Sequence, residues 1–275
     1  MVNIIILLVS ILSCFSIAAF ILYFTKPCKE SYDQSIVKNK IQAGKYIPKH
    51  IYMTYKNKHS IPSKVLENFK KYSKYNNQEI SYTIYDDDSC LKFIKKYFSK
   101  KVVDCFIRLP RGAYKADLFR YCILYVKGGI YFDIKTKLIK PLDEIFNLDQ
   151  NVLYTVLPEH PTAIYQGILL SPKGNQIFLD LIEGIINLSD SEINTDYQVI
   201  TNLTKKILMK YSESKKLLEG YNKLSNNMDC YLFVEKCTDV VPNNLEPDKY
   251  GLYCRIYDKG QHVFDTRFQD FGTIW

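Results

Sequence analysis

Arginine is scarce in this chain of 275 residues. Only five of the 37 basic residues are arginines, namely Arg108, Arg111, Arg120, Arg255 and Arg267. The formal net charge of +8 therefore rests on lysine. In a chain rich in Ile, Asn and Tyr this indicates coding bias more than a basic surface selected for polyanions, so we expect no nucleic-acid partner. Because lysine cannot replace a planar two-pronged donor, the few arginines become candidate site residues.

Metal-binding spacings are also absent. Neither a CxxC pair nor a His-x₃-His pair occurs among the eight cysteines and four histidines, so no structural zinc site is predicted. Cys230, Cys237 and Cys254 can supply one disulfide if the domain lies in a secretory lumen. The sequons at Asn187 and Asn202 would be glycosylated only in such a lumen.

Charged side chains are missing from residues 2–24. At about 1.5 Å per residue, this stretch can cross a hydrocarbon core about 30 Å thick. Since no basic residue precedes it and no small-x-small site ends it, we predict a single-pass membrane anchor over residues 1–25 and not a cleaved signal. Lys26 and Lys29 draw its carboxyl side toward the cytosol, whereas anchored enzymes of the secretory pathway usually face the lumen. We expect a luminal domain, and the orientation stays open.

The remainder of the chain lacks internal repeats and low-complexity linkers. Residues 26–46 are polar and mixed in charge, which is typical of a stem. From residue 47 the pattern alternates short strands with helices, and the strongest helix prediction, 112–127, ends at a Gly-Gly pair. This alternation predicts a single α/β domain over residues 47–275 with a mostly parallel sheet.

Ligands of parallel α/β sheets collect at the carboxyl ends of strands. Asp133 stands there, after the predicted strand GGIYF, and Asp117 and Arg120 lie one turn apart on the helix that leads into that strand. The simplest interpretation of the helix pair is an intrahelical ion pair worth about 0.3–0.5 kcal/mol. The alternative is a site in which carboxylates hold sugar hydroxyls and the arginine binds a phosphate.

A family resemblance favours the alternative. The segment LPRGAYKADLFRYCILYVKGGIYFDIKTKLIKPLDE, residues 109–144, closely resembles the glycosyltransferases of family 32, which carry an Asp-x-Asp sugar-binding motif. The opening IPKHIYMTYKN (47–57), YTIYDDDSC (82–90) and GILLSPKGNQIF (167–178) are similar to further blocks of that family. The resemblance implies a GT-A-like fold and retaining transfer of a hexose from a nucleotide-sugar donor.

The resemblance also implies roles for single residues. Asp117 and Arg120 match the family residues that contact donor sugar and phosphate, and Tyr131 and Asp133 match those that hold the donor and organise a Mn²⁺ or Mg²⁺ ion. Tyr55, on an opening strand where Tyr52 and Met53 depart from the family pattern, can stack on the base of a UDP- or GDP-hexose. Asp87 and Gln166 are weaker donor-side candidates.

Lys135 occupies the place of the second motif aspartate, which binds the metal in the family. Three interpretations are open. Taking 133–135 as strand, Lys135 points where Asp133 points, and its ammonium pairs with the diphosphate in place of a metal. Alternatively Asp133 keeps the metal with help from His262 or Asp270 of the tail. The third is that the site is inactive.

The sequence therefore predicts a membrane-anchored glycosyltransferase that acts on a glycan or glycolipid acceptor. The competing hypothesis is a catalytically inactive sugar- or nucleotide-binding subunit with the same fold.

Overall fold

The computed structural model describes residues 36–159, 163–238 and 253–267, all within a compact unit that begins at Ser35. Within these ranges no helix is long and apolar enough to cross a membrane. The predicted anchor over residues 1–25, as well as Asp270, lies outside them. Of the predicted stem, residues 36–46 pack on the domain, where Val37 pairs with Phe98 and Gly44 bonds to Lys173.

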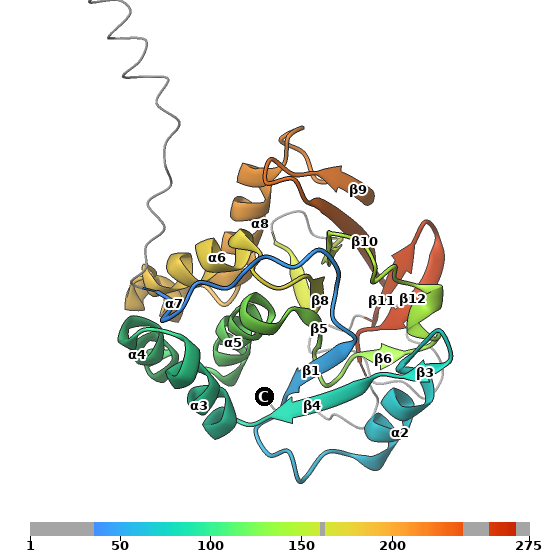
Figure 1. Ribbon diagram of the computed structural model, residues 1–275, viewed down its shortest axis with the longest axis horizontal. Helices are drawn as coiled ribbons and strands as arrows, with labels where there is room; N and C mark the ends of the chain where they lie inside the picture. Colours follow the sequence, from blue (N-terminus) through green and yellow to red (C-terminus); the bar gives the residue numbers. More distant parts are fainter. Residues whose placement is uncertain (1–35, 160–162, 239–252, 268–275) are drawn as a thin grey trace, which may run out of the picture. The chain divides into compact units, whose positions relative to one another are not determined.

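The elements alternate along the chain much as the sequence predicts (Figure 1). The strands are β1 (His50–Thr54), β2 (Lys74–Tyr75), β3 (Gln78–Glu79), β4 (Ser81–Tyr85), β5 (Gly129–Phe132), β6 (Lys137–Leu138), β7 (Val152–Leu157), β8 (Tyr165–Ser171), β9 (Gly220–Lys223), β10 (Asp229–Thr238), β11 (Tyr253–Asp258) and β12 (Gln261–Asp265). The helices are α2 (Ser63–Tyr72), α3 (Asp87–Tyr97), α4 (Lys100–Arg108), α5 (Gly112–Lys127), α6 (Gln176–Ile186), α7 (Asp190–Thr195) and α8 (Val199–Tyr211), with a short 3-10 turn at Leu142–Glu144.

One sheet runs in the order β4-β1-β5-β8-β7-β10-β11-β12-β6, with β9 beside β10. The predicted α/β domain is confirmed, and the prediction of a mostly parallel sheet is confirmed in part: among the described strands, β1–β4, β1–β5 and β7–β10 pair in parallel and the other pairings are antiparallel. Strand β8 is inserted antiparallel between β5 and β7, and the carboxyl-terminal strands form hairpins. By these pairings β4, β1, β5, β7, β10 and β12 still run in one direction. Their carboxyl ends therefore meet at one edge of the sheet.

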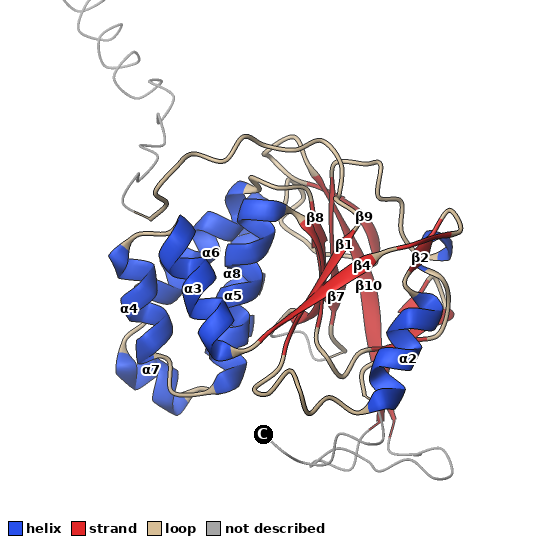
Figure 2. Ribbon diagram, turned by 60° about the horizontal axis from the view of Figure 1, so that its bottom comes forward, coloured by secondary structure: helices blue, strands red, loops and turns tan. Residues whose placement is uncertain are grey.

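Helices α3 to α8 gather on one face of the sheet, and α2 lies on the other (Figure 2). Aromatic side chains fill the α2 side, where Phe132, Phe146, Phe233 and Phe264 lie with ring centroids 5.6–6.5 Å apart. These side chains come from β5, β10, β12 and the loop before β7. Strands that are far apart in the strand order of the sheet therefore share one core, which means that the sheet is curled.

A tight joint links α5 to β5. Gly128 caps the helix at φ 64° and Gly129 opens the strand at φ 106°, both in the left-handed region that glycine tolerates. A Cβ on Gly129 would lie 2.8 Å from the His50 carbonyl oxygen. The Gly-Gly pair therefore lets helix and strand approach closely, which brings the faces of α5 to the carboxyl end of β5.

Candidate active site

The shared edge carries a row of polar side chains. Tyr55 follows β1, Asp86 follows β4, Asp133 follows β5, Glu159 follows β7, and Glu235 stands near the end of β10. The predicted place of Asp133 at the carboxyl end of a strand is confirmed.

Arg120 on α5 reaches this row through Asp133. Its Nη2 lies 3.2 Å from Oδ1 of Asp117 on α5 and 3.1 Å from Oδ1 of Asp133. The side chains of Arg120 and Asp117 are only 5% and 12% exposed, and that of Asp133 is 21% exposed. The pair is therefore not a solvated surface ion pair. One buried guanidinium joins two carboxylates from different elements.

Tyr131 completes this group. Its hydroxyl donates to Oδ1 of Asp133 at 3.3 Å and lies 2.8 Å from Oγ1 of Thr54 on β1. The Arg120 guanidinium carbon lies 4.7 Å from the centroid of the Tyr131 ring, within cation–π range. Side chains from β1, α5 and β5 thus fix the orientation of the Asp133 carboxylate before any ligand arrives.

Burial and charge oppose each other at Asp117. Burial raises the pKa of Asp117 to about 6, although Arg120 lowers it, and Asp133 raises it further. Burial also lowers the pKa of Arg120, but the surrounding Tyr131, Asp133 and Asp117 outweigh burial and raise the pKa above the usual value. Arg120 is therefore a permanent cation, while Asp117 changes charge near neutral pH.

Lys135 lies in a turn, not in a strand. Strand β5 ends at Phe132, and the Thr136 amide donates to the Asp133 carbonyl oxygen at 2.8 Å. The prediction that residues 133–135 form a strand, with Lys135 pointing to the same side as Asp133, is therefore wrong. The two charges still interact: burial lowers the pKa of the half-buried Lys135, the Asp133 carboxylate raises it, and Arg267 lowers it again.

The fit of a divalent cation at Asp133 is poor. The lysine at position 135 supplies a positive charge where a carboxylate ligand was expected. In the described part of the chain, the only group of three or more His, Cys, Asp or Glu ligand atoms is Glu235, Cys237 and Cys254, which excludes Asp133. His262 instead bonds to Oδ1 of Asp265 at 2.9 Å, and its predicted role beside Asp133 gains no support.

The other predicted donor-side residues are placed differently. Gln166 is 2% exposed. Its side-chain oxygen accepts from the Tyr121 hydroxyl and its side-chain nitrogen donates to Thr204, so both ends of the amide are bonded within the domain. Asp87 is exposed at the start of α3 and pairs with Lys115 at 3.1 Å.

Tyr55 is half-buried at the end of β1, where its amide donates to the carbonyl oxygen of Tyr85 at the end of the neighbouring strand β4. It therefore lies on the same edge as Asp133.

The sequence analysis did not anticipate Tyr165 and Glu235 as residues of the site. The Tyr165 ring lies over Gly167, and the Gly167 carbonyl accepts from the Asp133 amide at 2.8 Å. Burial raises the pKa of Tyr165, and Asp133 and Glu235 raise it further. Tyr165 therefore lies between the Asp133 loop and β10. No pattern in the sequence signals this, because the contact depends on β8 being antiparallel to β5.

The comparisons with known proteins cover part of the chain. Residues 62–152 match the model of the family described as glycosyltransferase sugar-binding region containing DXD motif. The initiation-specific alpha-1,6-mannosyltransferases of Saccharomyces cerevisiae and Candida albicans are each 31% identical, over 35% and 40% of this chain. These alignments span only 21% and 30% of the two yeast proteins.

A longer alignment joins this chain to an uncharacterized glycosyltransferase of Acanthamoeba polyphaga mimivirus. It is 24% identical and covers 63% of this chain and 60% of the viral protein. Among solved structures, the PaToxG glycosyltransferase matches at a TM-score of 0.46 and 16% identity, over 62% of this chain and 71% of that one.

Proposed function

Because residues 62–152 match the model of the family described as glycosyltransferase sugar-binding region containing DXD motif, we propose that this protein is a glycosyltransferase. It moves a hexose from a nucleotide-sugar donor, UDP- or GDP-linked, to a glycan or glycolipid acceptor. The names of the yeast relatives support mannose as the first hexose to test.

One observation carries the proposal. Arg120 lies between Asp117 and Asp133 at the carboxyl edge of the sheet. Its guanidinium also lies over the Tyr131 ring, and the Tyr131 hydroxyl donates to the Asp133 carboxylate. Carboxylates accept hydrogen bonds from sugar hydroxyls, and a guanidinium binds phosphate oxygens in a forked geometry. A donor that carries a hexose next to a diphosphate needs both kinds of group side by side.

The charges favour transfer without a metal. As the bond between the anomeric carbon and the diphosphate breaks, negative charge builds up on the leaving oxygen. Arg120 and Lys135 are the cations of this edge that act on Asp133, and we assign them to the leaving diphosphate. Because the described residues fit a divalent cation poorly at Asp133, no step is assigned to a metal.

The stereochemical proposal is retention. Both carboxylates at Arg120, Asp117 and Asp133, are held in ion pairs, so we assign no enzyme nucleophile, and the acceptor hydroxyl attacks the anomeric carbon on the face from which the diphosphate departs. The leaving phosphate oxygen takes the hydroxyl proton. Tyr131, whose hydroxyl also bonds to Thr54, holds the Asp133 carboxylate during this step.

The membrane anchor and its orientation remain part of the proposal. The apolar run 2–24 supports a single-pass anchor. The disulfide between Cys237 and Cys254 supports a luminal domain, because such bonds persist in oxidising compartments.

The test uses the purified full chain with a panel of UDP- and GDP-hexoses that includes the mannosyl donors. Nucleotide release and sugar transfer to a mannoside acceptor are followed with EDTA and with added Mn²⁺. We expect turnover that survives EDTA and falls at least about 100-fold in Asp133→Asn, the loss expected when a preorganised charged group is removed. Turnover that disappears in EDTA would show that a metal does the work assigned to Lys135.

The second candidate is an inactive donor-binding subunit, which Lys135 in the motif position favours. Calorimetry with the same donors distinguishes the two. Binding that depends on Arg120, without transfer or hydrolysis in any condition, identifies the subunit.

A further inference from the structure

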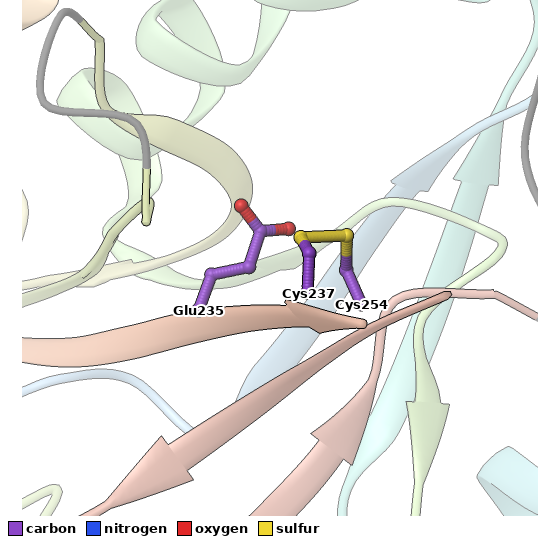
Figure 3. Close-up of side chains that lie close together, drawn as sticks. All are labelled: Glu235, Cys237 and Cys254. Carbon is purple, nitrogen blue, oxygen red and sulfur yellow. A yellow bond between two sulfur atoms is a disulfide. The ribbon is translucent and has the colours of Figure 1, made fainter. Parts of the chain in front are cut away.

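A second ligand-like cluster lies on β10 and β11, distinct from the Arg120 group although Glu235 stands at the same edge of the sheet. Cys237 and Cys254 are cross-strand partners joined by a disulfide, with their Cα atoms 4.1 Å apart. Glu235 stands two residues before Cys237, hence on the same face of β10. Its carboxylate lies beside the two sulfur atoms (Figure 3). One ligand atom from each residue lies within 4.8 Å of the other two, and all three residues are half-buried.

We propose that Cys237, Cys254 and Glu235 bind one Zn²⁺ ion when the disulfide is reduced. An external dithiol supplies two electrons and two protons, becomes a disulfide itself and leaves two cysteine thiols. Zn²⁺ then displaces the two thiol protons to solvent and is held by two thiolates and a carboxylate, with water as the fourth ligand. The bridge and the zinc site are alternative states of the same three residues.

The geometry suits this metal. Zn–S bonds of about 2.3 Å and Zn–O bonds of about 2.1 Å in a tetrahedron place the ligand atoms about 3.6–3.8 Å from one another. In the disulfide the two sulfur atoms are bonded to each other, so reduction must let them separate to reach this spacing, while the Glu235 carboxylate already lies within 4.8 Å of both. Two soft thiolates exclude Mg²⁺ and Ca²⁺, which select oxygen ligands.

A neighbouring contact holds the backbone of β10 at Cys237. The backbone amide of Cys237 donates to Oε2 of Glu159 at 2.7 Å. This bond ties β10 to the loop after β7 and does not involve the sulfur, so it persists after reduction. The backbone that carries the Cys237 sulfur is therefore held to the loop after β7.

Four other cysteines of the described chain are poor competitors. Cys90, Cys105, Cys122 and Cys230 are buried, and burial raises the pKa of each thiol. Because a metal binds the thiolate, these residues are unfavourable ligands at neutral pH. Thiolate–metal absorption from the described domain can therefore be traced to Cys237 and Cys254.

The test titrates Co²⁺, a spectroscopic substitute for zinc, into the full chain before and after reduction with a phosphine that is then removed without air. We expect one equivalent to bind the reduced protein, with thiolate-to-cobalt absorption and the visible bands of a tetrahedral site, and Zn²⁺ to displace it. Oxidised protein should show neither band. Glu235→Gln keeps both thiols and should weaken binding by about tenfold or more.

Two results would overturn the proposal. One is a reduced protein, with both thiols shown free by titration, that gives no thiolate-to-cobalt band. The other is a band that persists unchanged in the Cys237→Ser/Cys254→Ser variant, with circular dichroism confirming that the variant is folded. Glu235→Gln binding Co²⁺ as tightly as the unchanged protein would remove the carboxylate from the ligand set.

Discussion

Asp117 carries a buried charge that is stabilised by a single arginine. Its pKa in the folded protein, about 6, is above the ordinary 3.8 because burial outweighs the attraction of Arg120. The folded state therefore binds this proton more tightly than the unfolded chain does. The contribution to stability is complete below about pH 4 and is lost as pH rises through 6.

As pH rises through the pKa of Asp117, activity should increase and stability should decrease. Donor turnover should rise with pH through about 6, because the Asp117 carboxylate that we propose binds the sugar must be ionised. Between pH 4 and 8 the unchanged protein should lose about 3 kcal/mol of unfolding free energy relative to Asp117→Asn. Urea unfolding of the two proteins across that range measures the difference, and parallel curves would show that Asp117 has an ordinary pKa.

The forked geometry of Arg120 gives a second prediction. Lysine has one point charge and cannot serve Asp117 and Asp133 while also binding a phosphate. Arg120→Lys should therefore lower donor turnover by about tenfold to a hundredfold, the worth of one charged hydrogen bond.

Arg111→Lys is the matched control for that substitution. Arg111 precedes the same helix but stacks on Tyr114 and Tyr197, with its guanidinium carbon 5.4 and 5.2 Å from the two ring centroids. Its replacement should leave turnover within about twofold. Equal losses in both variants would point to a general effect on α5, not to a donor contact.

At the scale of elements, the joint between α5 and β5 decides where Asp117 and Arg120 meet Asp133. Gly129 has a φ of 106°, and a Cβ there would collide with the backbone of β1. Gly129→Ala should destabilise the protein by about 2–4 kcal/mol, from left-handed strain and overpacking together. Denaturant unfolding measures this loss.

Gly112→Ala tests whether that loss is specific to the joint. Gly112 opens the same helix, has an ordinary φ, and an added Cβ would meet no atom within 4 Å. The substitution should leave the unfolding free energy unchanged or raise it by up to about 1 kcal/mol, because alanine favours helix. A similar loss in both variants would refute the role assigned to Gly129.

At the scale of the whole molecule, the carboxyl-terminal strands close the curled sheet and carry its only disulfide in the described chain. Cys237 and Cys254 are 17 residues apart. In the chain-entropy model, opening a loop of this length costs about 3 kcal/mol of stability. Reductant should lower the unfolding free energy of the unchanged protein by that amount and leave Cys237→Ser/Cys254→Ser unaffected. Equal sensitivity of both proteins would locate the effect at another thiol.

The individual elements follow from local sequence. Asp86 caps α3 through the Ser89 amide, and Gly128 ends α5 where the sequence predicts the end of that helix. The strand that ends before Asp133 was equally legible from its apolar run. Caps, turns and periodicity act over a few residues, and a single chain segment contains all the information they need.

The association of Asp117, Arg120, Tyr131 and Asp133 was legible too, because helix and strand follow one another without a loop. What sequence could not give is the environment of Lys135. Alternation along a strand suggested the direction of the Lys135 side chain. The chain instead turns at Asp133, where the Asp133 amide donates to the Gly167 carbonyl oxygen of the antiparallel strand β8. His262 and Gln166 likewise found partners in Asp265 and in Tyr121 with Thr204.

The sequence by itself thus determined the elements, the likeness of residues 62–152 to the DXD sugar-binding glycosyltransferase model and the arginine-centred group, since each depends on neighbours in the chain. The tertiary structure alone decided that the sheet is mixed, that the Glu235 charge acts on Lys135 and Tyr165, and that Cys237 pairs with Cys254. These contacts join residues far apart in sequence. They arise because burying the aromatic side chains of β5, β10 and β12 in one core forces the sheet to curl.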